Sequence, residues 1–471
     1  LNPSQAITYG ELLYQARLIS QQLRTRLKPG ARALLIFPPG LEFVSAFFGC
    51  LHAGVIAVPA PELDPLRAKR GRPRLSSIAE NSEASAILTT RKIYQGKENR
   101  FEEFSQFGSG TIFCLEEICQ SSPNGKDHLS ERTHEIAFLQ YTSGSTSTPK
   151  GVIVTQQSLM QQLNALRHSC GLDDASISLN WMPHFHDYGL VNGLLLNVYL
   201  GTHTYLMSPM KFLRNPLVWL QAITKYQVTH SSGPNFAYEI CVTKTDPQER
   251  PGLDLRKWSF ASCGAEPIRV QTMDRFIHTF EPFGFHRQAF APAYGLAEFT
   301  LAATITPHGS TPTYLDLHPQ AMESGSIVPA PANAQGTRKI VCCGNPIHGA
   351  DVRIINEKTR SHCPPDRIGE IWLAGSSMAG GYWQQPQETL ETFNAFTADT
   401  GEGPFLKTGD LGFMKDGNLY VTGRSKEIII IRGNNYFPQD IERTVKESHP
   451  AFLQGATAAF SVPNGSGEQL V

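Results

Sequence analysis

The sequence predicts an α/β protein with a large multi-lobed N-terminal domain of parallel α/β sheets and a smaller β lobe. A hinge and an incomplete small α+β C-terminal domain should follow. Two observations support this prediction. Helix-like stretches alternate with short apolar runs in the first half of the chain, and short strand candidates separated by Gly, Pro and Asp turns dominate after about Lys339. With 471 residues and 41% hydrophobic content, the chain is long enough for more than one core.

The first elements show the alternation. Residues 7–27 carry apolar side chains at helical spacing, and Ala33–Phe37 form a short apolar run that Pro38 ends. A second helix-like stretch, Leu41–Ala53, leads into the run Val55–Val58. The pattern returns at Ile136–Leu139, Val198–Leu206 and Val228–His230. Repeated units of this kind are typical of a parallel sheet that is covered on both faces.

The strand candidates of the β lobe are Lys339–Cys343, Asp351–Ile355, Gly369–Ala374 and Asn418–Thr422. We therefore expect residues 1–425 to form the large domain, with the α/β sheets in 1–338 and the mostly β lobe in 339–425. Residues 426–471 should be the truncated start of the small C-terminal domain, which opens with an isoleucine run. Because the chain begins at Leu1 without a methionine, we expect it to be a fragment.

Composition excludes several classes of function. Lys and Arg total 41 against 42 for Asp and Glu, a balance that supplies no global field for nucleic acid or an anionic membrane. The nine cysteines are odd in number and form no C-x-x-C pair, which argues against a disulfide framework and predicts reduced thiols in a cytoplasm. No apolar stretch approaches the length of a membrane span, so we expect no stable membrane insertion.

Residues 141–152 read Tyr-Thr-Ser-Gly-Ser-Thr-Ser-Thr-Pro-Lys-Gly-Val, directly after an apolar strand candidate. Small residues let backbone N–H groups approach an anion, hydroxyls donate hydrogen bonds, and the lysine adds a point charge. The segment differs from a Walker A loop because glycine follows its lysine. We predict a phosphate-binding loop, with a Ser/Thr-rich turn as the alternative. Its candidate residues are Thr142, Ser143, Gly144, Ser145, Thr146 and Lys150.

Residues 181–190 place His184, His186 and Asp187 beside aromatic side chains. Their spacing leaves two interpretations open. A metal site is one, although such a segment seldom points three ligands inward. A buried histidine satisfied by a backbone carbonyl is the other.

The loop 141–152 resembles the phosphate-binding loop of the adenylate-forming superfamily, which includes acyl-CoA synthetases, luciferases and peptide-synthetase adenylation domains. Tyr294–Glu298 resembles the adenine and magnesium motif of that superfamily, and Lys407–Asp410 resembles its ribose motif. The likeness spans nearly the whole chain and sharpens to the fatty acyl-AMP ligases. The segments that carry this closer resemblance are 181–190, 232–239, 263–267, 292–298 and 431–442.

The resemblance implies a role for each matching residue. Tyr294 would stack on adenine, Asp410 would accept hydrogen bonds from both ribose hydroxyls, and Arg424 would reach the same ribose. Lys426 would be the hinge of the small domain. The family usually has Thr where this chain has Ala297, which leaves one contact to the α-phosphate in doubt. The remaining nucleotide-binding candidates are Gly264, Ala265, Glu266 and Gly295.

The implied catalytic residues are Lys150, His186 and Glu298. Glu298, together with Thr146, would hold Mg²⁺, whereas His186 would lie near the substrate carboxylate. An acyl pocket would include His186, Ser232, Gly233 and Phe236, at the entrance of a largely apolar tunnel.

The implied activity is the ATP- and Mg²⁺-dependent conversion of a fatty acid to fatty acyl-AMP with release of pyrophosphate. The acyl group would then pass to the phosphopantetheine thiol of an acyl carrier protein of a polyketide or non-ribosomal peptide synthase. A late C-terminal lysine of the family should lie beyond Val471. The alternatives are an acyl-CoA synthetase that uses free CoA and a non-catalytic acyl-adenylate binding domain.

A surplus of about twenty residues lies around Leu315–Arg338, between Glu298 and the turn at Gly344. Fatty acyl-AMP ligases resemble one another in carrying an insertion here. We expect it to pack against the large N-terminal region and to restrict either the small domain's rotation or the approach of CoA. The alternative is a tolerated surface loop.

Overall fold

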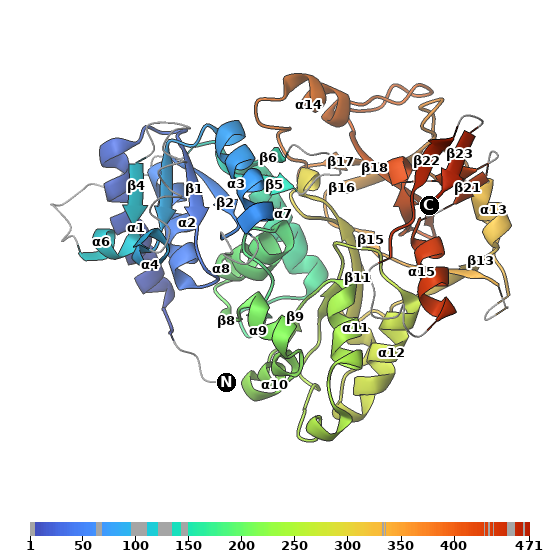
Figure 1. Cartoon of the computed structure of the whole chain (residues 1–471), viewed down its shortest axis with the longest axis horizontal. Helices are drawn as coiled ribbons and strands as arrows, with labels where there is room; N and C mark the ends of the chain where they lie inside the picture. The colour runs from blue at the N-terminus through green and yellow to red at the C-terminus, as the bar shows by residue number, and fades with distance from the viewer. Residues whose placement is uncertain are drawn as a thin grey trace.

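The structure is a computed structural model of the whole chain. It describes residues 5–62, 68–95, 111–120, 134–142, 149–331, 334, 336–427, 429–431, 434–436, 438–449, 457–464 and 467–471. The N-terminal sheet and its helices lie at one end of the molecule, and the C-terminal segment lies at the other end beside α13 (Pro319–Glu323) and β13 (Tyr314–Leu317) (Figure 1). This arrangement confirms the predicted α/β class with several sheets.

The N-terminal sheet has six strands in the order β4-β3-β1-β2-β5-β6. The first five strands along the chain run parallel, and β6 pairs antiparallel with β5. Its strands are β1 (Arg32–Ile36), β2 (Ile56–Ala60), β3 (Ala86–Thr89), β4 (Thr111–Cys114), β5 (Ile136–Thr142) and β6 (Lys150–Thr155). The predicted phosphate-binding loop, 141–152, therefore covers the end of β5, the start of β6 and the residues between them.

Helices cover both faces of this sheet. They include α1 (Tyr9–Arg26), α2 (Leu41–Ala53), α3 (Ala68–Ser82), α4 (Arg91–Gln95), α6 (Leu115–Gln120) and α7 (Gln156–Cys170). A capping box begins α1, in which Thr8 Oγ1 accepts from the Glu11 N–H and Glu11 Oε2 accepts from the Thr8 N–H. The two predicted helices at the N-terminus are confirmed.

Two further sheets form the middle of the molecule. One has the order β8-β7-β9 and the other β10-β11-β12-β15. Their strands are β7 (Ile177–Asn180), β8 (His203–Leu206), β9 (His230–Ser231), β10 (Ala261–Cys263), β11 (Phe290–Gly295), β12 (Ala302–Ile305) and β15 (Asn345–Pro346). Their core is aromatic, with Trp219, Trp258, Tyr238 and Phe276 fully buried.

The helices of this region are η2 (Tyr188–Leu195), α8 (Leu196–Leu200), α9 (Pro209–Arg214), α10 (Leu217–Tyr226), α11 (Asn235–Thr243) and α12 (Val270–Phe280). The η2 element is a π-helix. The prediction of one apolar unit at Val198–Leu206 is wrong. Its first residues end α8, and only its last four residues form β8. The left-handed Gly201 separates the two elements.

The β lobe is a four-stranded antiparallel sheet in the order β16-β17-β18-β19. Its strands are β16 (Ala350–Ile355), β17 (Gly369–Gly375), β18 (Leu406–Lys415) and β19 (Asn418–Arg424). Helix α14 (Pro386–Phe393) lies in the long connection between β17 and β18. Three of the four strands predicted for this lobe are confirmed as β16, β17 and β19, whereas the predicted strand Lys339–Cys343 corresponds to β14 (Arg338–Val341) of a separate sheet. Strand β18 was not predicted because Thr408, Gly409 and Asp410 read as a turn.

The surplus segment forms β13 (Tyr314–Leu317) and α13 (Pro319–Glu323) and returns through β14 (Arg338–Val341), which pairs antiparallel with β13. Leu317 and Met322 are buried in a cluster with Phe413 and Tyr420 of the β lobe. The segment therefore docks on the β lobe rather than on the α/β sheets, and the surface-loop alternative is wrong for these buried residues. Helix α13 also lies against β21 (Asn434–Tyr436) of the C-terminal segment, residues 425–471 (Figure 1).

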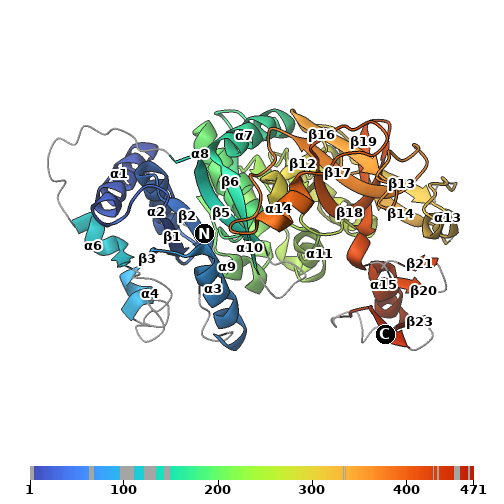
Figure 2. The same ribbon diagram turned by 90° about the horizontal axis from the view of Figure 1, so that it is seen from above.

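The C-terminal segment contains η7 (Ser425–Glu427), β20 (Ile429–Ile431), β21 (Asn434–Tyr436), α15 (Pro438–Ser448), β22 (Ser461–Asn464) and β23 (Gly467–Leu470). Figure 2 shows these elements set apart at one corner of the molecule. Within the described residues, no helix has the length and apolar character needed to cross a membrane. The eight cysteines whose side chains are described are free thiols.

Candidate active site

Asp410 and Arg424 are paired across neighbouring strands of the β lobe, where β18 and β19 place them in register. Arg424 Nε donates to Asp410 Oδ1 at 2.9 Å, and the Tyr294 hydroxyl donates to Asp410 Oδ2 at 2.8 Å. Asp410 is buried, whereas Arg424 is largely exposed. Three residues predicted to bind the nucleoside therefore meet at one carboxylate.

Neighbouring groups fix the backbone around Asp410. The Asp410 N–H donates to Thr408 Oγ1 at 3.0 Å, and the Thr408 hydroxyl donates to the Ile371 carbonyl at 2.6 Å. Glu370 accepts from the Gly409 N–H at 3.0 Å and from the Trp372 indole at 2.7 Å. Burial raises the pKa of Asp410, and the positive charge of Arg424 opposes that rise. The pairing thus favours the ionised form that a ribose diol requires.

Tyr294 is the residue before the last in β11, and the strand ends at Gly295, where the chain of residues 301–302 approaches closely. A Cβ on Gly295 would lie 1.9 Å from the Leu301 carbonyl oxygen, so any side chain would force the strand apart. The chain then enters the short η6 helix (Ala297–Phe299), which carries Glu298. Glycine at this position therefore brings Tyr294 and Glu298 to the same end of the strand.

Glu298 is half-buried, and its Oε1 accepts from the Tyr382 hydroxyl at 2.8 Å. Burial raises the pKa of Glu298, the Tyr382 hydrogen bond opposes the rise, and the charge of Asp187 adds to it. A hard divalent cation beside this carboxylate would stabilise its charged form, so the residues fit Mg²⁺. Among the described residues, no group of three His, Cys, Asp or Glu side chains could hold a metal by itself.

Lys150, the lysine of the predicted phosphate-binding loop, begins β6. Its Nζ forms an ion pair with Glu388 of α14 and lies 4.9 Å from the centroid of the Tyr382 ring. Thr142 ends β5 opposite Lys150. The other predicted loop residues, Ser143 to Thr146, lie outside the described residues. The lysine of the predicted phosphate-binding loop, Lys150, therefore has Glu388 as its charge partner in this structure.

His184, His186 and Asp187 do not converge. His184 is buried against the Phe43 ring at 4.0 Å between ring centroids, and both of its ring nitrogens lack hydrogen-bond partners. His186 is exposed and pairs through Nδ1 with Asp187 Oδ1 at 2.6 Å. Desolvation opposes protonation of His186, but the adjacent Asp187 outweighs it and raises the pKa. The metal alternative and the carbonyl-satisfied histidine are both wrong here.

The segment after β10 carries the candidates Gly264, Ala265 and Glu266. Ala265 adopts the left-handed conformation with φ of 65°, which is uncommon for a residue other than glycine and is often found at functional sites. Glu266 accepts from the Phe236 N–H at 2.6 Å, and Phe236 is 39% exposed. This contact links a predicted nucleotide segment to the predicted acyl pocket.

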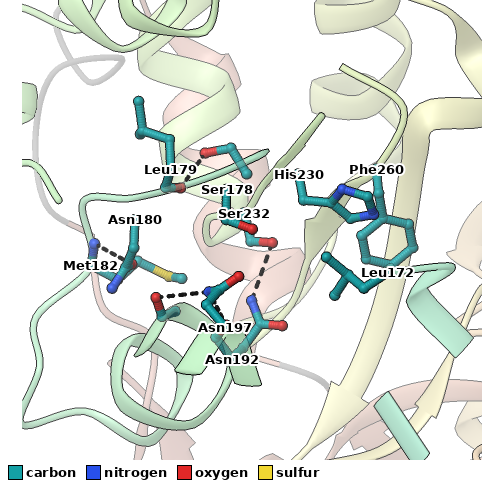
Figure 3. Close-up of a pocket in the computed structure, with 12 residues that line it drawn as sticks. Leu172, Ser178, Leu179, Asn180, Met182, Asn192, Asn197, His230, Ser232 and Phe260 are labelled. Carbon is teal, nitrogen blue, oxygen red and sulfur yellow. Dashed lines mark hydrogen bonds between the residues drawn. The ribbon is translucent and has the colours of Figure 1, made fainter. Parts of the chain in front are cut away.

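A small cavity lies behind Ser232, between η2 and strands β7 and β9. Figure 3 shows Asn192 directed toward Ser232, with His230 beside Phe260. Its lining mixes polar and apolar side chains, and the space inside suits about one water molecule. Next to it, a Cβ on Gly233 would approach the Trp181 ring to 3.0 Å. This cavity is not the apolar tunnel that we expected, which stays a prediction.

The sequence analysis did not assign two residues of this region to the site. Tyr382 and Glu388 contact Glu298 and Lys150 although they follow in a distant connection of the β lobe. The only local feature that could have pointed to Tyr382 is its position directly after two glycines, Gly380 and Gly381. That signal does not reveal the pairing of the 380–383 backbone with β6, where the Ile153 N–H donates to the Gly381 carbonyl.

Comparison with known proteins identifies the class. The model of the AMP-binding enzyme family matches residues 2–383, and the chain belongs to this family. A medium-chain-fatty-acid acyl-carrier-protein ligase, JamA of Moorena producens, is 47% identical over 99% of this chain and 79% of its own length. The long-chain-fatty-acid–AMP ligase FadD26 of Mycobacterium tuberculosis is 34% identical over 99% of this chain and 80% of its own length.

Solved structures agree with these relatives. A fatty acid AMP ligase from Legionella pneumophila aligns with a TM-score of 0.83 and 38% identity, covering 100% of this chain and 81% of that one. A structure from a study of fatty acyl-adenylate ligases from E. coli and L. pneumophila aligns with a TM-score of 0.87 and 30% identity, covering 100% of this chain and 82% of that one. The resemblance to the fatty acyl-AMP ligases is confirmed.

Proposed function

We propose that this enzyme uses ATP to convert a fatty acid to fatty acyl-AMP and transfers the acyl group to an acyl carrier protein. The observation that carries the proposal is the meeting of Tyr294 and Arg424 at Asp410. A buried carboxylate with acceptor capacity suits a vicinal diol, and an aromatic ring beside it suits a nucleobase. The similarity to the fatty acid ligase JamA supports the substrate class.

In the first half-reaction, a carboxylate oxygen of the fatty acid attacks the α-phosphorus of ATP. A new P–O bond forms in line with the bond that breaks, and pyrophosphate leaves with its bonding electrons. Catalysis is then mostly positioning and charge neutralisation. Asp410 and Arg424 hold the ribose and thereby fix the α-phosphorus relative to Lys150. His186, whose side chain is exposed, orients the incoming carboxylate.

Mg²⁺ would be held by Glu298 together with Thr146 and would neutralise phosphate charge. Tyr382 keeps the Glu298 carboxylate in place through its 2.8 Å hydrogen bond. Gly264, Ala265 and Glu266 line the adenine side, and the left-handed turn at Ala265 exposes backbone groups there. Ser232, Gly233 and Phe236 begin the acyl pocket.

In the second half-reaction, the phosphopantetheine thiol of an acyl carrier protein attacks the acyl carbonyl and AMP leaves. Rotation of the small domain about Lys426 would open the path of the thiol. The partner would be the carrier protein of a polyketide or non-ribosomal peptide synthase. The similarity to JamA, an acyl-carrier-protein ligase, supports a carrier-protein partner.

Mass spectrometry of the products tests the proposal. The protein, with its C-terminal domain complete, is incubated with ATP, Mg²⁺ and a panel of fatty acids, first alone and then with an acyl carrier protein or CoA. We expect acyl-AMP in the first case and acylated carrier protein in the second. Acyl-CoA as the main product would favour the acyl-CoA synthetase, and an absence of acyl-AMP would favour a binding domain.

A further inference from the structure

Lys150 has two partners that come from the β lobe rather than from its own sheet. Its Nζ pairs with a Glu388 carboxylate oxygen and lies over the ring of Tyr382. The Tyr382 hydroxyl in turn donates to Glu298. These contacts form a continuous chain of side chains from Glu388 through Lys150 and Tyr382 to Glu298. In this arrangement a carboxylate of the β lobe neutralises the charge of Lys150.

The backbone holds Glu388 in register with Lys150. The Trp383 N–H donates to the Gly151 carbonyl at 2.7 Å, and the Gly380 N–H donates to the Ile153 carbonyl at 2.8 Å. Helix α14 begins a few residues later at Pro386, so Glu388 lies in its first turn. Because β6 and this segment are bonded to each other, the ion pair is built into the fold.

The pair is also open to solvent. The side chain of Lys150 is 23% exposed and that of Glu388 is 41% exposed. A partly exposed ion pair contributes little to stability, because water competes for both charges. A phosphate group that approaches Lys150 meets the Glu388 carboxylate as a like charge, and the carboxylate can turn into water at low cost.

We propose that Glu388 is a positioning residue that competes with polyphosphate for Lys150. It holds the lysine near the phosphate site when that site is empty, gives way when ATP binds, and recaptures the lysine as pyrophosphate leaves. The inference rests on the proposed function, in which Lys150 binds phosphate. Glu388 thereby weakens the binding of ATP and pyrophosphate and prevents the enzyme from retaining its own product.

Calorimetric titration with magnesium pyrophosphate tests this proposal in Glu388→Gln. The amide keeps the shape of the side chain but removes the competing charge. We expect the variant to bind pyrophosphate about two- to fivefold more tightly than the parent, as loss of a partly exposed ion pair implies. The gain should shrink at high salt, where exposed charges are screened. Weaker or unchanged binding would overturn the proposal.

Two further variants sharpen the result. Glu391→Gln removes the same charge from an exposed position of α14, where the carboxylate accepts from Gln387 rather than from Lys150, and it should bind pyrophosphate like the parent. In a Lys150→Ala background, Glu388→Gln should have no effect on affinity. An equal gain in pyrophosphate affinity in that background, or in Glu391→Gln, would contradict the proposal. It would show that removing any negative charge from α14 strengthens binding, whether or not that charge pairs with Lys150.

These titrations also separate this inference from the proposed function. A parent protein that binds neither ATP nor pyrophosphate overturns both. A parent that binds both ligands and forms acyl-AMP, while Glu388→Gln is unchanged, overturns only the role of Glu388.

Discussion

Arg424 Nε donates to Asp410 Oδ1 at 2.9 Å, and the two residues are direct cross-strand partners on β18 and β19. Arg424 is the last residue of β19, and η7 with Lys426 follows at once. Asp410, whose carboxylate is proposed to bind ribose, is thus hydrogen-bonded to Arg424, which lies two residues before the proposed hinge at Lys426. A change in the nucleotide contacts of Asp410 would therefore change the contacts of the residues at which the small domain begins.

Asp410→Ala should weaken ATP binding. The change removes a charged acceptor for two ribose hydroxyls, and each such hydrogen bond is worth about 1.5–3 kcal/mol. The affinity measured by calorimetry should therefore fall at least about tenfold. Asp351→Ala is the matched control, because Asp351 also pairs with an arginine of the β lobe, Arg353 at 3.2 Å. Unchanged ATP affinity in Asp410→Ala would remove the ribose assignment.

Glu298→Gln should raise the Mg²⁺ concentration needed for adenylation, since an amide lacks the charge that a hard cation prefers. Excess Mg²⁺ should partly restore the rate. Burial raises the pKa of Glu298, and only its ionised form binds a cation. Activity of the parent should therefore fall with decreasing pH at a higher pH than for an exposed glutamate. As a control, Glu281→Gln at an exposed position should change neither the Mg²⁺ dependence nor the pH dependence of adenylation. If Glu298→Gln needs no more Mg²⁺ than the parent, Glu298 has only a structural role.

His184→Phe should make the fold less sensitive to acid. Burial lowers the pKa of His184 to about 3, so the folded protein keeps it neutral while the unfolded chain binds a proton below its ordinary pKa. The stability present above that ordinary pKa is lost as pH falls, by about 1.4 kcal/mol per unit. Tm measured at pH values from about 7.5 to 5.5 should fall less in the variant.

The exposed residue His278 offers the control for that comparison. His278→Gln should show the pH dependence of the parent. Parallel Tm curves for the parent and His184→Phe would mean that His184 is hydrated or protonated in the folded state.

Removal of α13 should permit transfer to free CoA. Leu317 and Arg338 are paired at the end of the β13–β14 hairpin, so an Asn-Gly turn in place of residues 318–337 closes the hairpin. This change deletes the helix that lies against β21. In a protein with a complete C-terminal domain, acyl-CoA should rise from near zero while acyl-AMP is roughly preserved. A folded variant that makes acyl-AMP but no acyl-CoA would show that CoA is rejected elsewhere.

Sequence alone predicted the parts of the fold that are encoded locally. Helix α2 was predicted with its observed bounds because apolar side chains recur at helical spacing up to the left-handed Gly54. Strand β18 was missed, because its Thr-Gly-Asp segment reads as a turn while the pairing that makes it a strand comes from β17 and β19. Local pattern does not carry information about distant strands.

The candidate site shows the same division. Tyr294, Asp410 and Arg424 were predicted from short motifs and meet in the structure. Glu388 and Tyr382 were not predicted, because their relation to Lys150 depends on the packing of the β lobe against β6.

Fatty-acid-dependent exchange of radiolabelled pyrophosphate into ATP tests the central claim most directly, because exchange requires reversible formation of acyl-AMP. The protein with its complete C-terminal domain is assayed with Mg²⁺, ATP, labelled pyrophosphate and either dodecanoate or acetate. Burial of each methylene gains about 0.8 kcal/mol, so we expect exchange with dodecanoate, little with acetate, and almost none in Asp410→Ala. Exchange that is absent with every fatty acid, or that is faster with acetate than with dodecanoate, would contradict the assignment of fatty acid adenylation to this chain.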